Sequence, residues 1–324
     1  TRGDVIHTIF DNLAGKPAAD AEWGATATLM ANKVAVAQYY TEVLLGNTTN
    51  LATLQSVLAD VTPTTNVSTP AAIQALLGDV FNAQGQTFTL TTSADQVPGM
   101  NGSAGNISTT GNDVYVANNS TLSSADRIVD AAGNADKLKY SSQVFQDHSA
   151  FEMKGVETLE VTADGGTTQS GFDLSGAQGL TLLKSLNSTG RTVFGQVTSL
   201  ANIEVNNVTS SSSAPVNHQV AVQYQDSVVS GAANEVTLTL ANNSNVNPVG
   251  GVWIGRVFDG DSNPGTGIET LNVVTSGSAA TLTRLTSQIS TMNVSGDQNL
   301  TIQTALQPTV DTIAAGGFTG ALNV

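Results

Sequence analysis

The sequence of 324 residues contains no cysteine. This absence excludes disulfide bonds, thiolate metal sites and cysteine nucleophiles. A chain without cysteine is compatible with the bacterial secreted proteins that cross the envelope in one step.

Basic residues are scarce. The chain has 11 Lys and Arg against 26 Asp and Glu, which gives a net charge of −15 at pH 7 and an isoelectric point near 4.2. Nucleic acid and anionic lipid both require clustered basic residues, so the composition argues against either partner. Charged residues make up only 11% and aromatic residues 5% of the chain. An acidic chain of this kind attracts cations.

Long apolar runs are also missing. No stretch approaches the ~18 consecutive apolar residues of a membrane span, so we expect no transmembrane segment. The first residues, Thr1 to Asp4, do not resemble a signal peptide, and the chain ends on Asn323 and Val324 within a strand-like repeat. We therefore expect a processed product or a fragment, with the β region continuing beyond Val324.

Residues 1–85 have apolar side chains at helical spacing. The pattern predicts helices near the N-terminus, across residues 20–45, and from Leu51 to Thr62. A fourth helix is expected to begin at Pro70, because proline suits the first helical turn. These helices predict a small bundle that forms an N-terminal domain.

Residues 86–324 change to a period of two, which is typical of half-buried strands. Copies of one strand unit recur, which predicts stacked rungs that bury their apolar faces against their neighbours. The expected fold is multi-domain α + β: a helical bundle (1–85), then an all-β region (86–324) that is a β-solenoid or β-sandwich-like. Stretches 219–224 and 235–240 need not belong to this ladder. The copies are 155–162, 200–206, 267–273, 289–294 and 310–313. A similar short stretch, 321–324, follows the last of them.

One acidic loop, Phe258 to Gly265, has oxygen-bearing side chains at alternate positions. Asp259, Asp261 and Asn263 could converge on one Ca²⁺, as in the first half of an EF-hand loop. The match is incomplete, because Pro264 stands where the EF-hand glycine belongs. The alternative interpretation is a turn between two strands.

A second acidic pattern is Thr110-Gly-Asn-Asp-Val-Tyr-Val116, followed by residues 126–138. In such segments glycine lets backbone carbonyl groups face an ion, and aspartate supplies charge. The alternative is that these aspartates shape turns. The candidate ligands in this pattern are Asp113, Asp126, Asp130 and Asp136.

These residues carry a resemblance to calcium-binding S-layer and RTX-related secreted surface proteins of Gram-negative bacteria. Residues 110–116 are similar to the segment that begins a strand in these proteins. Gly133, Asp136 and Leu138 resemble the retained positions of a degenerate copy of their glycine-rich calcium turn. Residues 31–44 are similar to the helical domain that precedes their β region. The full nonapeptide repeats of the family are missing here.

The resemblance implies a structural role. It implies export by type I secretion, Ca²⁺ as cofactor and an extracellular location on the bacterial cell surface. The expected function is a calcium-dependent S-layer or related assembly that self-associates through its β domain. The resemblance also implies an N-terminal domain that binds lipopolysaccharide or another envelope glycan.

A search for catalytic residues yields little, so we expect no enzyme. His7, His148 and His218 lie far apart, and no metalloprotease or serine-hydrolase motif occurs. Glu157 and Glu160 alternate with apolar residues on one strand, which favours a solvated face over an acid–base pair. The alternative functions are a calcium-stabilised surface adhesin that binds glycans or host proteins, and a polysaccharide lyase of the β-helix type.

Overall fold

The computed structural model describes residues 2–43, 51–77, 85–97, 111–130, 133–165, 169–209, 218–242, 250–256 and 267–324. The chain divides into two compact units, one built around residues 1–86 and the other around 87–95, 113–129 and 134–324. Among the described helices, none has the length and apolar character that crossing a membrane requires.

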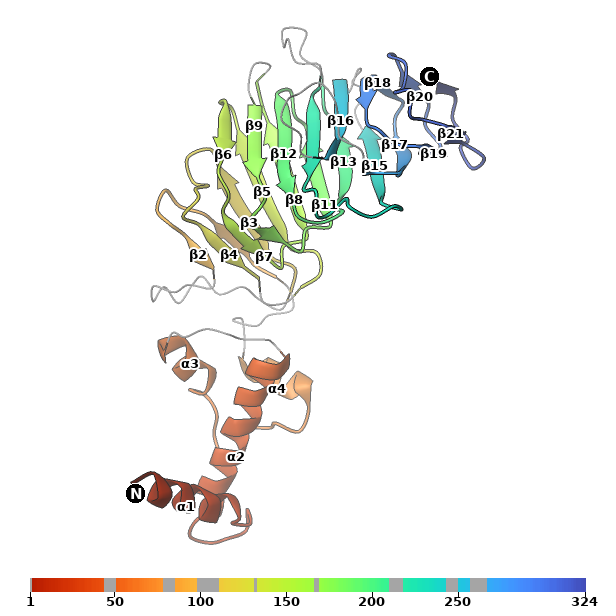
Figure 1. Cartoon of the computed structure of the whole chain (residues 1–324). Helices are drawn as coiled ribbons and strands as arrows, with labels where there is room; N and C mark the ends of the chain where they lie inside the picture. Colours follow the sequence, from red (N-terminus) through yellow and green to blue (C-terminus); the bar gives the residue numbers. More distant parts are fainter. Residues whose placement is uncertain are drawn as a thin grey trace. The chain divides into compact units, whose positions relative to one another are not determined.

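The described residues of the first unit form four short α-helices and one π-helix, which Figure 1 shows in red and orange. The start of the last helix follows its sequence signal, since the Thr69 hydroxyl accepts the backbone N–H of Ala72 at 3.2 Å and Pro70 opens the first turn. The helices are α1 (Arg2–Ala14), α2 (Gly24–Gln38), which continues as the π-helix η1 (Tyr39–Val43), α3 (Leu51–Val57) and α4 (Pro70–Leu77).

The predicted helical bundle is wrong. The described helices are short, and Ile9 and Phe10 of α1 are 58% and 54% exposed instead of facing a shared core. The fold-class prediction is therefore corrected: the protein is mostly β, with a β-solenoid of about eight turns. The described residues of the helical unit include a small buried apolar cluster, formed by Val36, Tyr39, Tyr40, Val57, Val61 and Ile73.

The second unit is the solenoid, whose described strands form three sheets, and every pairing within the ten-stranded and eight-stranded sheets is parallel. Parallel pairing along the whole stack excludes the β-sandwich alternative, because such sandwiches are built from antiparallel strands. Figure 1 shows the strands lying side by side in chain order.

Ten of the described strands form the largest sheet, which runs along one side of the stacked turns. In sheet order they are β1 (Thr87–Thr89), β3 (Val114–Asn118), β5 (Lys137–Ser142), β8 (Thr158–Ala163), β11 (Leu182–Leu186), β13 (Asn202–Asn206), β15 (Glu235–Asn242), β17 (Thr270–Gly277), β19 (Thr291–Gly296) and β21 (Thr312–Ala314).

Two further sheets close the turns. The eight-stranded sheet contains β6 (Gln146–His148), β9 (Gln169–Asp173), β12 (Arg191–Val197), β14 (Val220–Tyr224), β16 (Gly250–Arg256), β18 (Ala280–Thr286), β20 (Leu300–Ile302) and β22 (Leu322–Asn323). The four-stranded sheet contains β2 (Gln96–Val97), β4 (Arg127–Val129), β7 (Glu152–Lys154) and β10 (Ala177–Gln178).

The strand copies predicted from the sequence correspond to β8, β13, β17, β19 and β21, all in the ten-stranded sheet. The two stretches set apart from the ladder are also part of the solenoid. Residues 235–240 lie in β15, between β13 and β17, and residues 219–224 lie in β14. More residues separate these strands from their neighbours along the chain, but the strands pair in the same parallel way.

The core consists of side-chain columns that run through successive turns. One column contains nine residues in register, all buried, because every second side chain of each strand points inward. Its members are Phe88, Tyr115, Leu138, Leu159, Leu183, Ile203, Leu238, Val273 and Val294.

The outer face of the same sheet carries charges that alternate in sign from strand to strand. Lys139, Glu160, Lys184 and Glu204 are in register. The Lys184 ammonium lies 3.6 Å from Glu160 and 3.1 Å from Glu204. Glu160 is only 8% exposed. The expected solvated face is therefore an ion-paired row, which leaves Glu160 unavailable as a catalytic base.

A buried histidine lies inside the solenoid. The His148 ring stacks on Phe172, with centroids 5.3 Å apart, and its Nε2 lies 2.7 Å from the Tyr140 hydroxyl oxygen. Burial holds the pKa of His148 below its usual value, because a charged imidazolium is poorly solvated there.

We expect Leu159→Ala to destabilise the solenoid by about 2–5 kcal/mol, because it leaves a cavity in the continuous column. The measurement is urea unfolding followed by the β-sheet circular dichroism signal. Leu200→Ala is the matched control, since Leu200 is 38% exposed. A similar effect of both substitutions would contradict the column as the main source of stability.

The buried neutral imidazole predicts a loss of stability in mild acid. The folded-state pKa of His148 is lowered, so its contribution is complete above the unfolded pKa of about 6.5 and is lost as the pH falls below it. His148→Phe should reduce the difference in melting temperature between pH 7.5 and pH 5.5. His7→Phe, at an exposed histidine, should leave that difference unchanged.

Candidate metal centre at the amino-terminal edge of the large sheet

The residues that immediately precede the strands of the large sheet lie along one edge. Asp113 precedes β3, Asp136 precedes β5 and Glu157 precedes β8. Because β3, β5 and β8 are parallel and in register, these three acidic side chains lie on successive turns. The stacking of turns therefore brings together residues that are more than 20 positions apart in the sequence.

The carboxylates of Asp136 and Glu157 each accept a backbone N–H from the preceding turn. The backbone N–H of Asp113 donates to Asp136 Oδ1 at 2.5 Å, and the N–H of Asp136 donates to Glu157 Oε2 at 2.9 Å. The same arrangement recurs further along the sheet, where the N–H of Asn234 donates to Glu269 at 2.7 Å. Glu157 and Glu269 are the glutamates of the repeated Gly-x-Glu-Thr-Leu unit. Their carboxylates accept backbone N–H groups that take no part in the hydrogen bonds between strands.

Glycine is required just before these glutamates. Gly155 and Gly267 have φ values of +67° and +131°, which residues with a Cβ rarely adopt. A Cβ on Gly267 would also lie 2.7 Å from the carbonyl oxygen of Val229. The spacing of Gly and Glu is the same in the two copies, and it sets the turn that positions the carboxylate.

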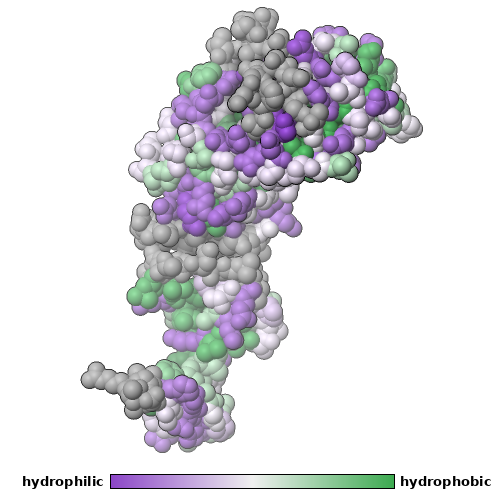
Figure 2. All heavy atoms as spheres, viewed as in Figure 1, coloured by the Kyte–Doolittle hydropathy of each residue, from purple (hydrophilic) through white to green (hydrophobic). Residues whose placement is uncertain are grey.

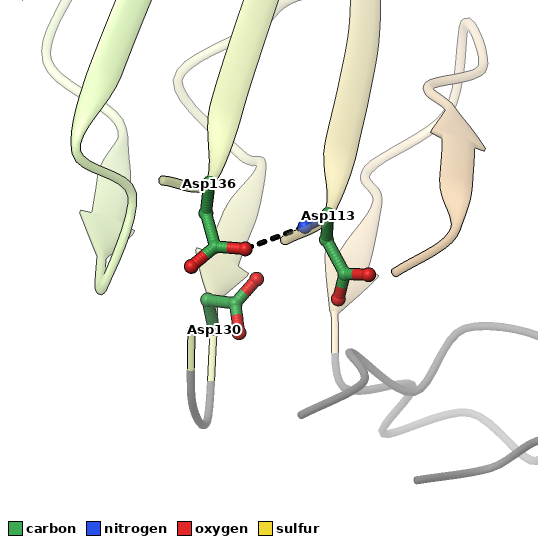
Figure 3. Close-up of side chains that lie close together, drawn as sticks. All are labelled: Asp113, Asp130 and Asp136. Carbon is green, nitrogen blue, oxygen red and sulfur yellow. Dashed lines mark hydrogen bonds between the residues drawn. The ribbon is translucent and has the colours of Figure 1, made fainter. Parts of the chain in front are cut away.

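Asp130 joins two of these edge residues. It directly follows β4, and one carboxylate oxygen from each of Asp113, Asp130 and Asp136 lies within 4.8 Å of the others. Figure 3 shows the carboxyl groups of Asp136 and Asp130 facing one another, with that of Asp113 beside them. Asp113 and Asp136 are 0% exposed and Asp130 is 8% exposed.

The electrostatics of this cluster are unfavourable without a positive charge. Burial is the main cause that raises the pKa of Asp136, to about 7, and the neighbouring carboxylates of Glu157 and Asp113 raise it further. The hydrogen bond from the Asp113 backbone acts in the opposite direction. Among the described residues, Asp136 Oδ2 has no hydrogen-bond partner although it is buried.

These residues fit a hard divalent cation. Ca²⁺ takes 6–8 oxygen ligands, drawn from carboxylates, carbonyl groups and water. The three aspartates supply carboxylate oxygens from three separate segments, and Asp136 Oδ2 is a buried acceptor that lacks a donor. A bound cation would compensate the like charges that raise the pKa of Asp136.

Asp126, another predicted ligand, lies elsewhere and has a different task. It precedes β4 in the four-stranded sheet, and its two oxygens accept the backbone N–H groups of Asp95 at 2.8 Å and Ser123 at 2.7 Å. Burial raises the pKa of Asp126. Its carboxylate therefore caps a turn, as the alternative interpretation expects for these aspartates. Asp259, Asp261 and Asn263 lie outside the described residues.

Glu157 is the member of the edge that sequence reasoning did not assign to a metal site. A signal was present in the repeat, because Glu157 and Glu269 occupy the same position of two copies. The parallel register was needed to show that this position continues the row of Asp113 and Asp136.

The fold and the edge together define a parallel β-solenoid with a buried carboxylate cluster. No protein-family model, curated protein or solved structure matches the chain.

In buffer with EDTA, the raised pKa of Asp136 predicts that its proton stabilises the folded state. The stabilisation is complete below the unfolded pKa of about 4 and is lost as the pH rises through about 7. Asp136→Asn keeps an oxygen that accepts the N–H of Asp113 but carries no charge. It should melt at a higher temperature than the wild type at pH 8, and the gain should shrink at pH 4.

Asp297→Asn provides the control for the change in net charge, because Asp297 lies in an exposed turn. It should leave the melting temperature unchanged at both pH values. A lower melting temperature of Asp136→Asn at pH 8 would show that the carboxylate is stabilising there, contrary to this account.

Proposed function

We propose that the protein is a structural component of the bacterial cell surface, an S-layer or a related extracellular assembly that requires calcium. The observation that carries the proposal is the buried cluster of Asp113, Asp130 and Asp136, in which one oxygen lacks a partner. The cluster connects successive turns of an extended β-solenoid. This architecture suits a scaffold, since each turn depends on its neighbours.

Calcium would act first on the solenoid itself. Asp113 and Asp136 precede β3 and β5, and Asp130 follows β4, so one ion would tie three strand ends together. Binding requires deprotonated carboxylates and stabilises the folded state only. The turns nearest the cluster should therefore become rigid when calcium is present.

Calcium would also permit self-association. The chain carries a net charge of −15 at pH 7, and copies with the same charge repel one another. Bound cations reduce this repulsion, and the β unit offers long rows of Thr, Asn and Ser for contacts between copies. Hydrophilic and intermediate side chains cover most of the described surface of this unit that Figure 2 displays.

The remaining parts of the proposal rest on the resemblance stated for the sequence. They are export by type I secretion, an extracellular location, and attachment of the helical unit to lipopolysaccharide or another envelope glycan. The proposed role is structural and not enzymatic. The rival function is a calcium-stabilised adhesin, which would bind its ligand as a monomer.

Calcium should raise the melting temperature and particle size together. We expect wild-type protein at pH 7.5 to form large particles in millimolar Ca²⁺, seen by light scattering and electron microscopy, and to return to small particles with EDTA. Asp136→Asn should lose most of both responses, because it removes a ligand charge. Asp297→Asn should retain both.

Two outcomes separate the parts of this proposal. If neither melting temperature nor particle size responds to Ca²⁺, the calcium mechanism is wrong. If the melting temperature rises but the protein stays monomeric at all concentrations, calcium stabilises the fold and the adhesin is the better description.

A further inference from the structure

A polar hollow lies at the opposite, carboxyl-terminal edge of the same three strands. Its volume is about 390 Å³, within the range of small-ligand sites. Its lining comes from three successive turns, with three residues each from the segments that end β3 and β5 and two from the segment that ends β8. The residues that matter here are Asn118, Asn119, Ser141, Gln143, Thr162 and Asp164.

Two of these groups are held in place by the protein and keep a free polar atom. Asn118 Oδ1 accepts the backbone N–H of Ser120 at 2.8 Å, which orients the amide. Asp164 Oδ1 accepts the hydroxyl of Thr189 at 3.2 Å. Among the described residues, neither Asn118 Nδ2 nor Asp164 Oδ2 has a hydrogen-bond partner. The hollow therefore presents a donor and an acceptor that are already oriented.

The lining excludes several classes of ligand. It contains no Lys, Arg or His, so phosphate, sulfate and acidic polysaccharides would meet only the charge of Asp164. It contains no apolar side chain, so it does not suit a lipid tail. Amide, hydroxyl and carboxylate groups instead match a neutral ligand with many hydroxyl groups, each of which donates and accepts.

An exposed aromatic residue stands next to the hollow in the sequence. Phe145 follows the lining residue Gln143 by two positions, in the turn between β5 and β6, and is 62% exposed. Val144 beside it is 46% exposed. Large apolar side chains at the surface often mark interaction sites. The face of an aromatic ring suits the C–H face of a pyranose ring.

We propose that this hollow and Phe145 bind a neutral oligosaccharide. The sugar hydroxyls would bond to Asn118, Gln143 and Asp164 across successive turns, and one ring would pack on Phe145. The turns repeat along the solenoid axis, so a chain of sugar units can follow them. This inference does not rest on calcium-dependent assembly, because the hollow and the aspartate cluster lie at opposite ends of the strands.

The test is saturation-transfer NMR of the whole chain with cellotriose, mannotriose and the trimer of N-acetylglucosamine, with trigalacturonate as the acidic probe. At least one neutral trimer should bind with a Kd on the order of 1 mM. Trigalacturonate should bind more weakly, because Asp164 repels its carboxylates. The measurements are made in EDTA, so that failure of calcium binding does not affect the result.

Three variants locate the site. Phe145→Ala should weaken binding about fivefold, which corresponds to about 1 kcal/mol. Asp164→Asn should weaken the binding of neutral trimers. It should also reduce the ratio between the Kd of trigalacturonate and the Kd of the neutral trimers, because the repulsion of the trigalacturonate carboxylates is removed. Leu200→Ala replaces an exposed apolar residue away from the hollow and should bind as the wild type does.

The proposal is overturned if no neutral trimer binds. It is equally overturned if Phe145→Ala and Asp164→Asn bind as tightly as the wild type, or if trigalacturonate binds best. All the substituted residues are exposed, and unchanged circular dichroism spectra confirm that the variants fold.

Discussion

Parallel, in-register pairing between successive turns is the constraint on which the rest of the structure depends. It satisfies the backbone donors and acceptors of each strand with those of the next turn. The same register aligns side chains of equal position into columns. Inside the solenoid this produces the continuous apolar core, and outside it produces the row in which Lys184 lies between Glu160 and Glu204. A chain with only 5% aromatic residues can fold this way because each turn adds a buried side chain, aliphatic in most turns, to a long shared core.

The same register also concentrates charge where the strands begin. A single carboxylate can accept a backbone N–H and so hold a turn, as Glu269 and Asp126 do. When Asp113, Asp136 and Glu157 occupy consecutive turns, their carboxylates become neighbours and repel one another. The raised pKa of Asp136 and its unpartnered oxygen are the consequences. The row of carboxylates at this edge is thus a structural feature of the repeat. It becomes a candidate cation site where Asp130 adds a third aspartate.

Part of this could be predicted from the sequence. Alternation of apolar residues located the strands, and the recurrence of one unit predicted stacked turns, because both signals are local. The helical segments were located by the same kind of signal, but not their packing. Apolar spacing in α1 indicates an apolar face, whereas Ile9 and Phe10 stay more than half exposed among the described residues. Likewise β14 and β15 were set apart from the ladder, since strand register follows from pairing between turns and not from a local pattern.

The candidate site, too, could be predicted only in part from the sequence. The sequence alone determined that the chain is acidic, lacks thiol chemistry and carries aspartates in glycine-rich turns, since composition and spacing are properties of the chain itself. Only the tertiary structure decided that Asp113, Asp130 and Asp136 meet, that Asp126 instead caps Asp95 and Ser123, and that Glu157 continues the row. The physical reason is that these contacts cross from one turn to the next. The distance between two side chains then depends on strand register and turn length, which no local pattern specifies.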